Sequence, residues 1–209
     1  ELIKMEQSSK YLGKPFIIMS EIEGQAASPF DKESYKPYQE EIGAQFWTIL
    51  ANITNFDISK INSDSHISMI QEDQNWKQQL DYWVKVIRED SIGIEPILEM
   101  AIRYLYKNNP KDSHQLVLVH GDFRSGNFLF KENIITGILD WEMAHLGDPL
   151  EDLAWALSSI WCWEEKNRPA YLLERNSALD IWEDATGLTI DQDSLFWWEL
   201  FSCVKGLAI

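Results

Sequence analysis

The sequence predicts an α+β fold that is mainly helical and contains a small β insert. Apolar residues recur with helical spacing within residues 34–107 and again after Pro149. Between residues 116 and 139, short apolar runs with tight connections replace that spacing and predict strands. The chain has 209 residues, of which 45% are hydrophobic, and no long linker divides it. We therefore expect one helical core interrupted by a small sheet.

The N-terminal half is expected to hold one strand and three helices. A turn with Gly13 and Pro15 leads into the apolar run 16–19, which predicts a short strand. Small and polar residues over 25–33 predict a loop. Beyond this loop, the spacing of apolar residues predicts helices over 34–53, 76–87 and 94–107.

The C-terminal half begins with strands and ends with helices. The apolar runs predict strands over 116–119, 127–130 and 134–139, the last two forming a β-hairpin. Pro149 suits the first turn of a helix, and Asp148 is placed to cap it. The predicted helices are 149–161, 169–186 and 192–207, with Gly187 separating the last two.

Charge and composition exclude several classes of function. Eighteen Lys and Arg against 34 Asp and Glu give a net charge of -16, which disfavours nucleic acid and anionic membranes as partners. No apolar run approaches the ~20 residues of a membrane-spanning helix, and Cys162 and Cys203 cannot form a disulfide framework. We expect a cytoplasmic protein with a small-molecule substrate. Oligomeric state leaves no signal in the sequence.

The densest cluster of polar residues lies in the loop 120–127, between two predicted strands. The hairpin that follows would bring Asn127 close to Asp140, at the end of its second strand. An amide oxygen, a carboxylate and the further carboxylate of Asp122 form the kind of oxygen site that Mg²⁺ prefers. Phosphoryl transfer needs Mg²⁺ on the nucleotide phosphates and a carboxylate that orients the attacking hydroxyl, a role that suits Asp122.

Three motifs in this order resemble the aminoglycoside phosphotransferase (APH) family. They are His120-Gly121-Asp122 with Asn127, Asp140-Trp141-Glu142, and Gly147-Asp148-Pro149 with Asp152. The resemblance implies a protein-kinase-like fold with its active site on the β-hairpin insert, a catalytic loop at 120–127 and a metal-binding segment at 140–142. It also implies that Asp122 is the catalytic base, that Asn127 and Asp140 bind Mg²⁺, and that Asp152 braces the loop.

Residues 15–24 resemble the strand and hinge that join the two lobes in this family. On this chain the backbone of Ser20 and Ile22 would then pair with the nucleotide base. Residues 1–24 would be the end of the N-terminal lobe with its hinge, and 25–209 the helical C-terminal lobe. Most of an N-terminal lobe, with its Gly-rich loop and phosphate-binding lysine, is not recognised, so we expect this chain by itself to bind nucleotide poorly and to have little or no activity.

The sequences of the motifs are most similar to those of the kinase-like domains that are fused to acyl-CoA dehydrogenases. Drug-modifying members of the family more often have His or Leu at the position of Arg124, which puts an aminoglycoside substrate in doubt. Arg124 would either neutralise phosphate or pair with a carboxylate. Glu142 would face the substrate, assist the metal indirectly or be solvated.

His120 has two interpretations, a metal ligand or a residue that hydrogen-bonds the backbone and fixes the loop, and we favour the second. The expected function is ATP- or GTP-dependent, Mg²⁺-requiring transfer of the γ-phosphoryl group to a hydroxyl of a small molecule. An aminoglycoside, an amino-alcohol such as choline or a hydroxyacyl compound would all fit. The alternatives are a non-catalytic kinase-like regulatory or binding module, and a metal-dependent phosphohydrolase using His120, Asp122 and Asp140.

Overall fold

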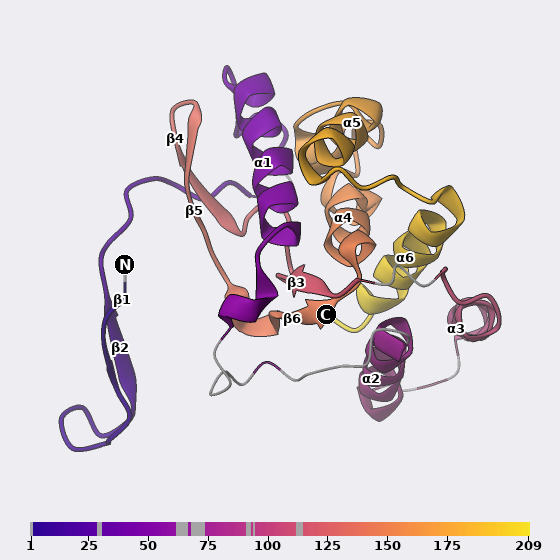
Figure 1. Ribbon diagram of the computed structural model, residues 1–209, viewed down its shortest axis with the longest axis horizontal. Helices are drawn as coiled ribbons and strands as arrows, with labels where there is room; N and C mark the ends of the chain where they lie inside the picture. Colours follow the sequence, from indigo (N-terminus) through magenta and orange to yellow (C-terminus); the bar gives the residue numbers. More distant parts are fainter. Residues whose placement is uncertain are drawn as a thin grey trace.

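A computed structural model describes residues 2–28, 31–61, 67, 74–90, 93, 95–111 and 115–209 (Figure 1). At the N-terminus, β1 (Leu2–Glu6) pairs antiparallel with β2 (Phe16–Met19). Figure 1 shows this hairpin standing apart from the helices, and an extended segment connects it to them. Strand β2 confirms the predicted strand. Strand β1 was not predicted, because all but its last residue are exposed and no buried face marks its sequence.

Four helices form the main body. The helix α1 (Gln39–Thr54) packs against α5 (Arg175–Thr186), and α4 (Pro149–Leu157) packs against α6 (Gln192–Lys205). The core face of α1 carries Ile42, Phe46 and Leu50, which are fully buried and four residues apart, as a helix requires. The helix begins later than predicted, because Asp31 accepts hydrogen bonds from the Glu33 N–H and the Ser34 hydroxyl and so fixes a turn.

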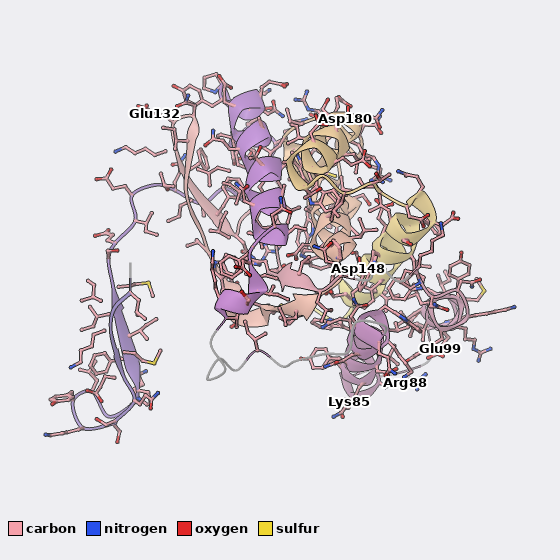
Figure 2. All side chains as sticks on the ribbon, viewed as in Figure 1. Lys85, Arg88, Glu99, Glu132, Asp148 and Asp180 are labelled. Atoms are coloured by element: carbon pink, nitrogen blue, oxygen red, sulfur yellow. The ribbon has the colours of Figure 1, made fainter. Side chains whose placement is uncertain are left out.

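Two further helices pack on the far side of α6. They are α2 (Asn75–Asp90) and α3 (Pro96–Lys107), and both contact α6. Pro96 stands in the first turn of α3, where its missing N–H costs nothing. Lys85 and Arg88 are exposed on α2 (Figure 2), and Arg88 lies 3.9 Å from Glu99 of α3. Both helices confirm the prediction made from the spacing of apolar residues.

The four strands that follow α3 form two small antiparallel pairs that hold the loop 120–127 between them. The predicted hairpin is formed by β4 (Phe128–Lys131) and β5 (Ile134–Ile138), with Glu132 at its tip (Figure 2). The predicted strand 116–119 is β3 (Val117–Val119), which pairs with β6 (His145–Gly147). Strand β6 was not predicted, since three residues are too few to show an alternating pattern.

The C-terminal helices are shorter than predicted. Ser158 has extended backbone and its hydroxyl accepts the Ile160 N–H, so α4 ends and a 3₁₀ turn, η4 (Ser159–Trp161), follows. The predicted helix 169–186 is divided into the 3₁₀ turn η5 (Pro169–Tyr171) and α5, because Ala170 and Tyr171 have positive φ angles. Among the described residues, every helix is too short or too polar to cross a membrane.

Candidate active site

The loop 120–127 runs from the end of β3 to the start of β4 and rests on the carboxylate of Asp152. That carboxylate accepts the N–H groups of His120, at 2.6 Å, and Gly121, at 3.0 Å. Asp152 lies in α4, whose first turn is fixed by Asp148, because the Asp148 side chain accepts the Leu150 N–H at 2.8 Å (Figure 2). Burial raises the pKa of Asp152, and His120 and the charge of Lys205 oppose that shift. The structure thus places Asp152 where a brace for the loop would be.

His120 connects this loop to the segment that carries Asp140. Its Nδ1 accepts the Asp122 N–H at 3.2 Å, which assigns the ring proton to Nε2. Nε2 then donates to the carbonyl oxygen of Leu139 at 2.9 Å. Both ring nitrogens are therefore occupied by backbone groups within the fully buried imidazole. This geometry matches the backbone-fixing interpretation and leaves no nitrogen for a metal.

Asp122 is 8% exposed, and its carboxylate accepts hydrogen bonds from three side chains. The amide nitrogen of Asn127 donates to it at 2.6 Å, the indole Nε1 of Trp155 donates at 2.8 Å, and Nε of Arg124 lies 3.1 Å from both oxygens. Asn127 also donates to the backbone carbonyl of Asp122 at 2.9 Å. These three donors thus hold the carboxylate in one orientation.

Asn127 and Asp140 are brought to the same end of the hairpin, as predicted. The Leu139 N–H donates to the Asn127 carbonyl at 2.8 Å, and Asp140 is the next residue. Asp140 is exposed and has a left-handed backbone with φ of 65°, a conformation that Asp tolerates better than most residues. Because the amide nitrogen of Asn127 is used by Asp122, its amide oxygen is the free end of the side chain.

These oxygens suit Mg²⁺, which prefers carboxylate and carbonyl ligands. In the described part of the chain, no group of three or more His, Cys, Asp and Glu side chains could hold a metal by itself. A magnesium ion at Asn127 and Asp140 would therefore need further oxygen ligands from phosphates or water. Glu142 is exposed and lines a cavity of about 270 Å³ with Trp83 and Lys205.

Arg124 pairs with a carboxylate, which was one of its two predicted roles. Besides the contacts to Asp122, its Nη1 donates to the Ser125 carbonyl at 3.0 Å. The guanidinium lies over the ring of Trp161, 4.7 Å from its centre. In this arrangement Arg124 covers the carboxylate of Asp122 from the side of η4.

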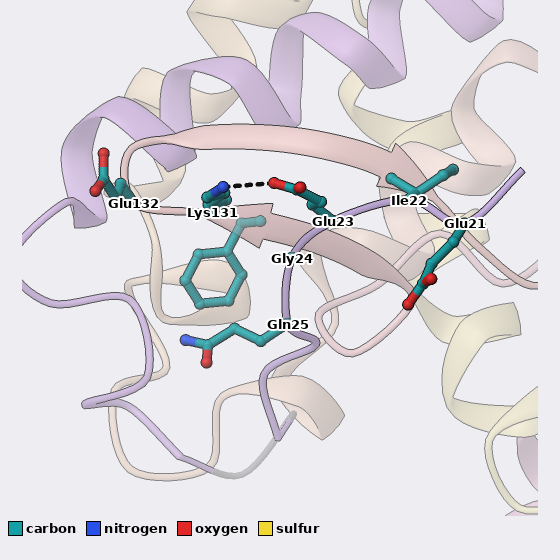
Figure 3. Close-up of a pocket in the computed structure, with 8 residues that line it drawn as sticks. Glu21, Ile22, Glu23, Gly24, Gln25, Lys131 and Glu132 are labelled. Carbon is teal, nitrogen blue, oxygen red and sulfur yellow. Dashed lines mark hydrogen bonds and ion pairs between the residues drawn. The ribbon is translucent and has the colours of Figure 1, made fainter.

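The predicted hinge lies beside the β4–β5 hairpin and borders a cavity of about 490 Å³ (Figure 3). Residues 21–25 form one wall of this cavity and residues 130–132 form the other. The backbones of Gln25 and Phe130 exchange two hydrogen bonds, and an ion pair joins Lys131 to Glu23 across the opening. Ile22 lines the cavity, whereas Ser20 lies one residue outside the lining segment.

Sequence reasoning missed three features around the loop. Trp155 donates to the carboxylate of Asp122, and the signal for it is that it follows Asp152 by three residues and so shares its helix face. Lys205 donates from the end of α6 to the Gly121 carbonyl. Lys205 follows the buried Trp198 by seven residues and the buried Phe201 by four, and this helical spacing places it on the buried face of α6.

A third missed feature is the pair formed by His145 and Glu151. Their side chains lie 3.1 Å apart, and His145 Nδ1 also lies 2.8 Å from the Met143 carbonyl. Burial alone would lower the pKa of His145, but the carboxylate of Glu151 raises it to about 9. This contact, in which the imidazole lies against a buried carboxylate, was not predicted from the sequence.

Comparison with known proteins finds a matching family and similar proteins. The profile described as "Phosphotransferase enzyme family" (APH) matches residues 1–188. Acyl-CoA dehydrogenase family member 11 of Rattus norvegicus is 26% identical over 184 residues, which cover 85% of this chain and 23% of that protein. Its Homo sapiens counterpart is 36% identical over 80 residues, covering 37% of this chain and 10% of that protein. The chain thus spans less than a quarter of these relatives.

Solved structures share the fold at low sequence identity. A candidate aminoglycoside phosphotransferase from Ralstonia eutropha JMP134 superposes with a TM-score of 0.80 at 19% identity, covering 100% of this chain and 66% of that one. The GDP complex of aminoglycoside 2'-phosphotransferase-IIIa gives a TM-score of 0.65 at 16% identity, covering 100% and 67%. The profile covers most of the sequence and the folds agree, so this chain belongs to the APH phosphotransferase family and has its protein-kinase-like α+β fold.

Proposed function

We propose that this protein transfers a phosphoryl group from a nucleoside triphosphate to a hydroxyl group of a small molecule. The observation that carries the proposal is the fixed carboxylate of Asp122. It projects from a loop that Asp152 and His120 hold to the body of the protein, and it lies beside Asn127 at the end of the hairpin that leads to Asp140. Phosphoryl transfer depends mainly on such positioning and on charge stabilisation.

In the proposed reaction Asp122 orients the acceptor hydroxyl and takes its proton as the oxygen attacks phosphorus. The hydrogen bonds from Asn127 and Trp155 keep the carboxylate in place during this step. Arg124 would have to move aside, because its single Nε–H lies 3.1 Å from both oxygens of Asp122, on the carboxylate edge that the acceptor hydroxyl needs. Arrival of the nucleotide phosphates would offer Arg124 an alternative anion.

Asn127 and Asp140 would hold Mg²⁺ against the phosphates, and the ion would neutralise their charge. The nucleotide base would lie at the hinge, with the backbone of Ser20 and Ile22 as its partners. We base this on the cavity beside residues 21–25 and on solved relatives in complex with GDP, and with ADP and streptomycin. Residues 1–24 would then be the hinge end of the N-terminal lobe, and 25–209 the C-terminal lobe.

The test uses the full-length protein that contains this sequence, with MgATP and MgGTP as probes. Asp122→Asn should bind nucleotide as the wild type does but lose at least about 100-fold in turnover, because the general base is removed. Asp140→Ala should lose the magnesium dependence of binding. Asp180→Asn, on the exposed face of α5, is the matched control and should change neither quantity.

Two outcomes would contradict the proposal. Turnover by Asp122→Asn at the wild-type rate would show that Asp122 is not the general base. Nucleotide binding by the wild type without transfer to any acceptor in a panel of aminoglycosides, choline and hydroxyacyl compounds would favour a non-catalytic kinase-like module. This 209-residue chain alone is expected to bind nucleotide weakly in the same assay.

A further inference from the structure

Lys205 is a buried cation beneath the loop 120–127. It lies in the last turn of α6, is 2% exposed and donates from Nζ to the carbonyl of Gly121. The ammonium group lies 4.5 Å from the ring centre of Trp155 and 5.4 Å from that of Trp83. Two indole rings and one carbonyl therefore replace the water that a lysine normally keeps.

The surroundings of Lys205 are acidic. Among the residues that the structure describes, it is the one buried Lys or Arg, whereas four carboxylates are buried, namely Asp122, Asp148, Glu151 and Asp152. Burial lowers the pKa of Lys205, and the charges of Glu151, Asp152 and Asp122 oppose that shift. An uncompensated group of buried carboxylates would be costly, so the ammonium group has an electrostatic reason to be where it is.

The contact with Gly121 has a geometric consequence for Asp122. The peptide unit that joins these two residues is held at both ends, since its carbonyl accepts from Lys205 and its N–H donates to His120 Nδ1. The preceding N–H, that of Gly121, is held by Asp152. Gly121 has a φ of +85°, and a Cβ there would collide with the Met143 carbonyl. The backbone just before the carboxylate thus has little room to rotate.

We propose that Lys205 is a positioning residue for phosphoryl transfer, which fixes the Gly121–Asp122 peptide from the C-terminal helix. The inference rests on the proposed function of Asp122. It adds a residue that lies 84 positions away in sequence and outside the three family motifs. A lysine kept only for packing would be replaceable by Met, which has a similar shape and no charge.

The first test measures hydrogen exchange of the backbone amides of residues 120–122 in the full-length protein. These amides are all hydrogen-bonded in the structure, to Asp152 and to His120. Lys205→Met should exchange them about tenfold faster than the wild type, because the loop loses a charge-assisted hydrogen bond. Val204→Ala is the matched control, because it destabilises the same turn of α6 from the buried side.

The exchange rates of Lys205→Met and Val204→Ala are compared under conditions in which urea unfolding gives both variants the same free energy of unfolding. If Lys205→Met and Val204→Ala then show the same exchange at residues 120–122, Lys205 has only a packing role and the proposal is overturned. If Lys205→Met does not fold, Lys205→Arg, which keeps the charge and a donor, is measured instead. In Lys205→Arg the amides of residues 120–122 should exchange more slowly than in Val204→Ala. Faster exchange in Lys205→Arg than in Val204→Ala would overturn the proposal.

The second test separates positioning from binding by kinetics. With MgATP or MgGTP, Lys205→Met should lose about tenfold or more in kcat with KM within about twofold of the wild type. Lys205→Arg should recover part of the loss. Equal kcat in Lys205→Met and the wild type would overturn the proposal. If the wild type neither binds nor turns over nucleotide, the proposed function fails, and the exchange experiment alone decides whether Lys205 fixes the loop.

Discussion

The pair of His145 and Glu151 predicts a loss of stability at alkaline pH. The folded-state pKa of His145 is about 9, against an ordinary value of 6.5, so folding favours the protonated imidazole. A group whose pKa is raised by folding stabilises the folded state fully below its unfolded pKa, and that contribution is lost as pH rises through the folded pKa. The relevant window therefore runs from about pH 6.5 to about pH 9.

The size of the effect follows from the same two values. His145 is calculated to contribute about 3 kcal/mol to the free energy of unfolding at pH 6.5, about 2 kcal/mol at pH 7.5 and less than about 0.5 kcal/mol at pH 9. Little screening by solvent is expected, because the side chains of His145 and Glu151 are 15% and 2% exposed. The pair is thus unlike a surface salt bridge.

Urea unfolding followed by tryptophan fluorescence measures this quantity between pH 6 and pH 9.5. His145→Gln can still donate a hydrogen bond to Glu151 but does not titrate in this range. Subtracting its stability curve from that of the wild type removes the titration of lysines and other common groups. The difference should fall by about 2.5 kcal/mol from pH 6.5 to pH 9. A difference that is flat with pH would refute the reasoning.

Three other substitutions test the site and its support. Trp155→Phe keeps a ring but removes the donor to Asp122, so it should lower the free energy of unfolding by about 2 kcal/mol and kcat by about tenfold, measured by urea unfolding and nucleotide turnover. Asp148→Ala removes the cap of α4 and should cost about 1 kcal/mol, whereas Asp180→Ala on an exposed helix face should cost less than about 0.5 kcal/mol; equal losses would contradict the capping role. Gly121→Ala combines a left-handed backbone with a collision against Met143 and should cost at least about 2 kcal/mol in thermal or urea unfolding, and a neutral result would mean that the backbone there is free to shift.

Local patterns were sufficient to predict most helices and the β4–β5 hairpin. In α1, apolar residues repeat at helical spacing and one face is fully buried, so periodicity alone identifies the helix. The turn between β4 and β5 is short, so the opposition of Asn127 and Leu139 follows from neighbouring residues. The expected ends were less accurate, because α4 ends at Ser158 and the positive φ angles of Ala170 and Tyr171 separate η5 from α5, and the spacing of apolar residues does not predict such backbone breaks.

The residues that sequence reasoning missed are joined to the site by long-range contacts. Strand β6 exists because β3 lies opposite to it, and its three residues have no strand signal of their own. The contact of His145 with Glu151 was not predicted, because Glu151 belongs to α4 and the pairing depends on burial. Spacing in sequence can place side chains on a face, but it does not show which faces meet.

The geometry of the loop 120–127 depends both on local sequence and on long-range contacts. The roles proposed for Asp122 and Asn127 depend on six residues of contiguous sequence, and a motif is enough to find them. Their fixed geometry depends on Asp152, Leu139 and Lys205, which are 32, 19 and 84 positions from the loop residues they contact. Asp152 belongs to the third motif, whereas Lys205 lies outside all three, so a substitution at Lys205 would leave every motif residue unchanged and is still expected to move the carboxylate. Intact motifs therefore predict the chemistry proposed for this site, whereas its rate would also depend on a support in α6 that the motifs do not contain.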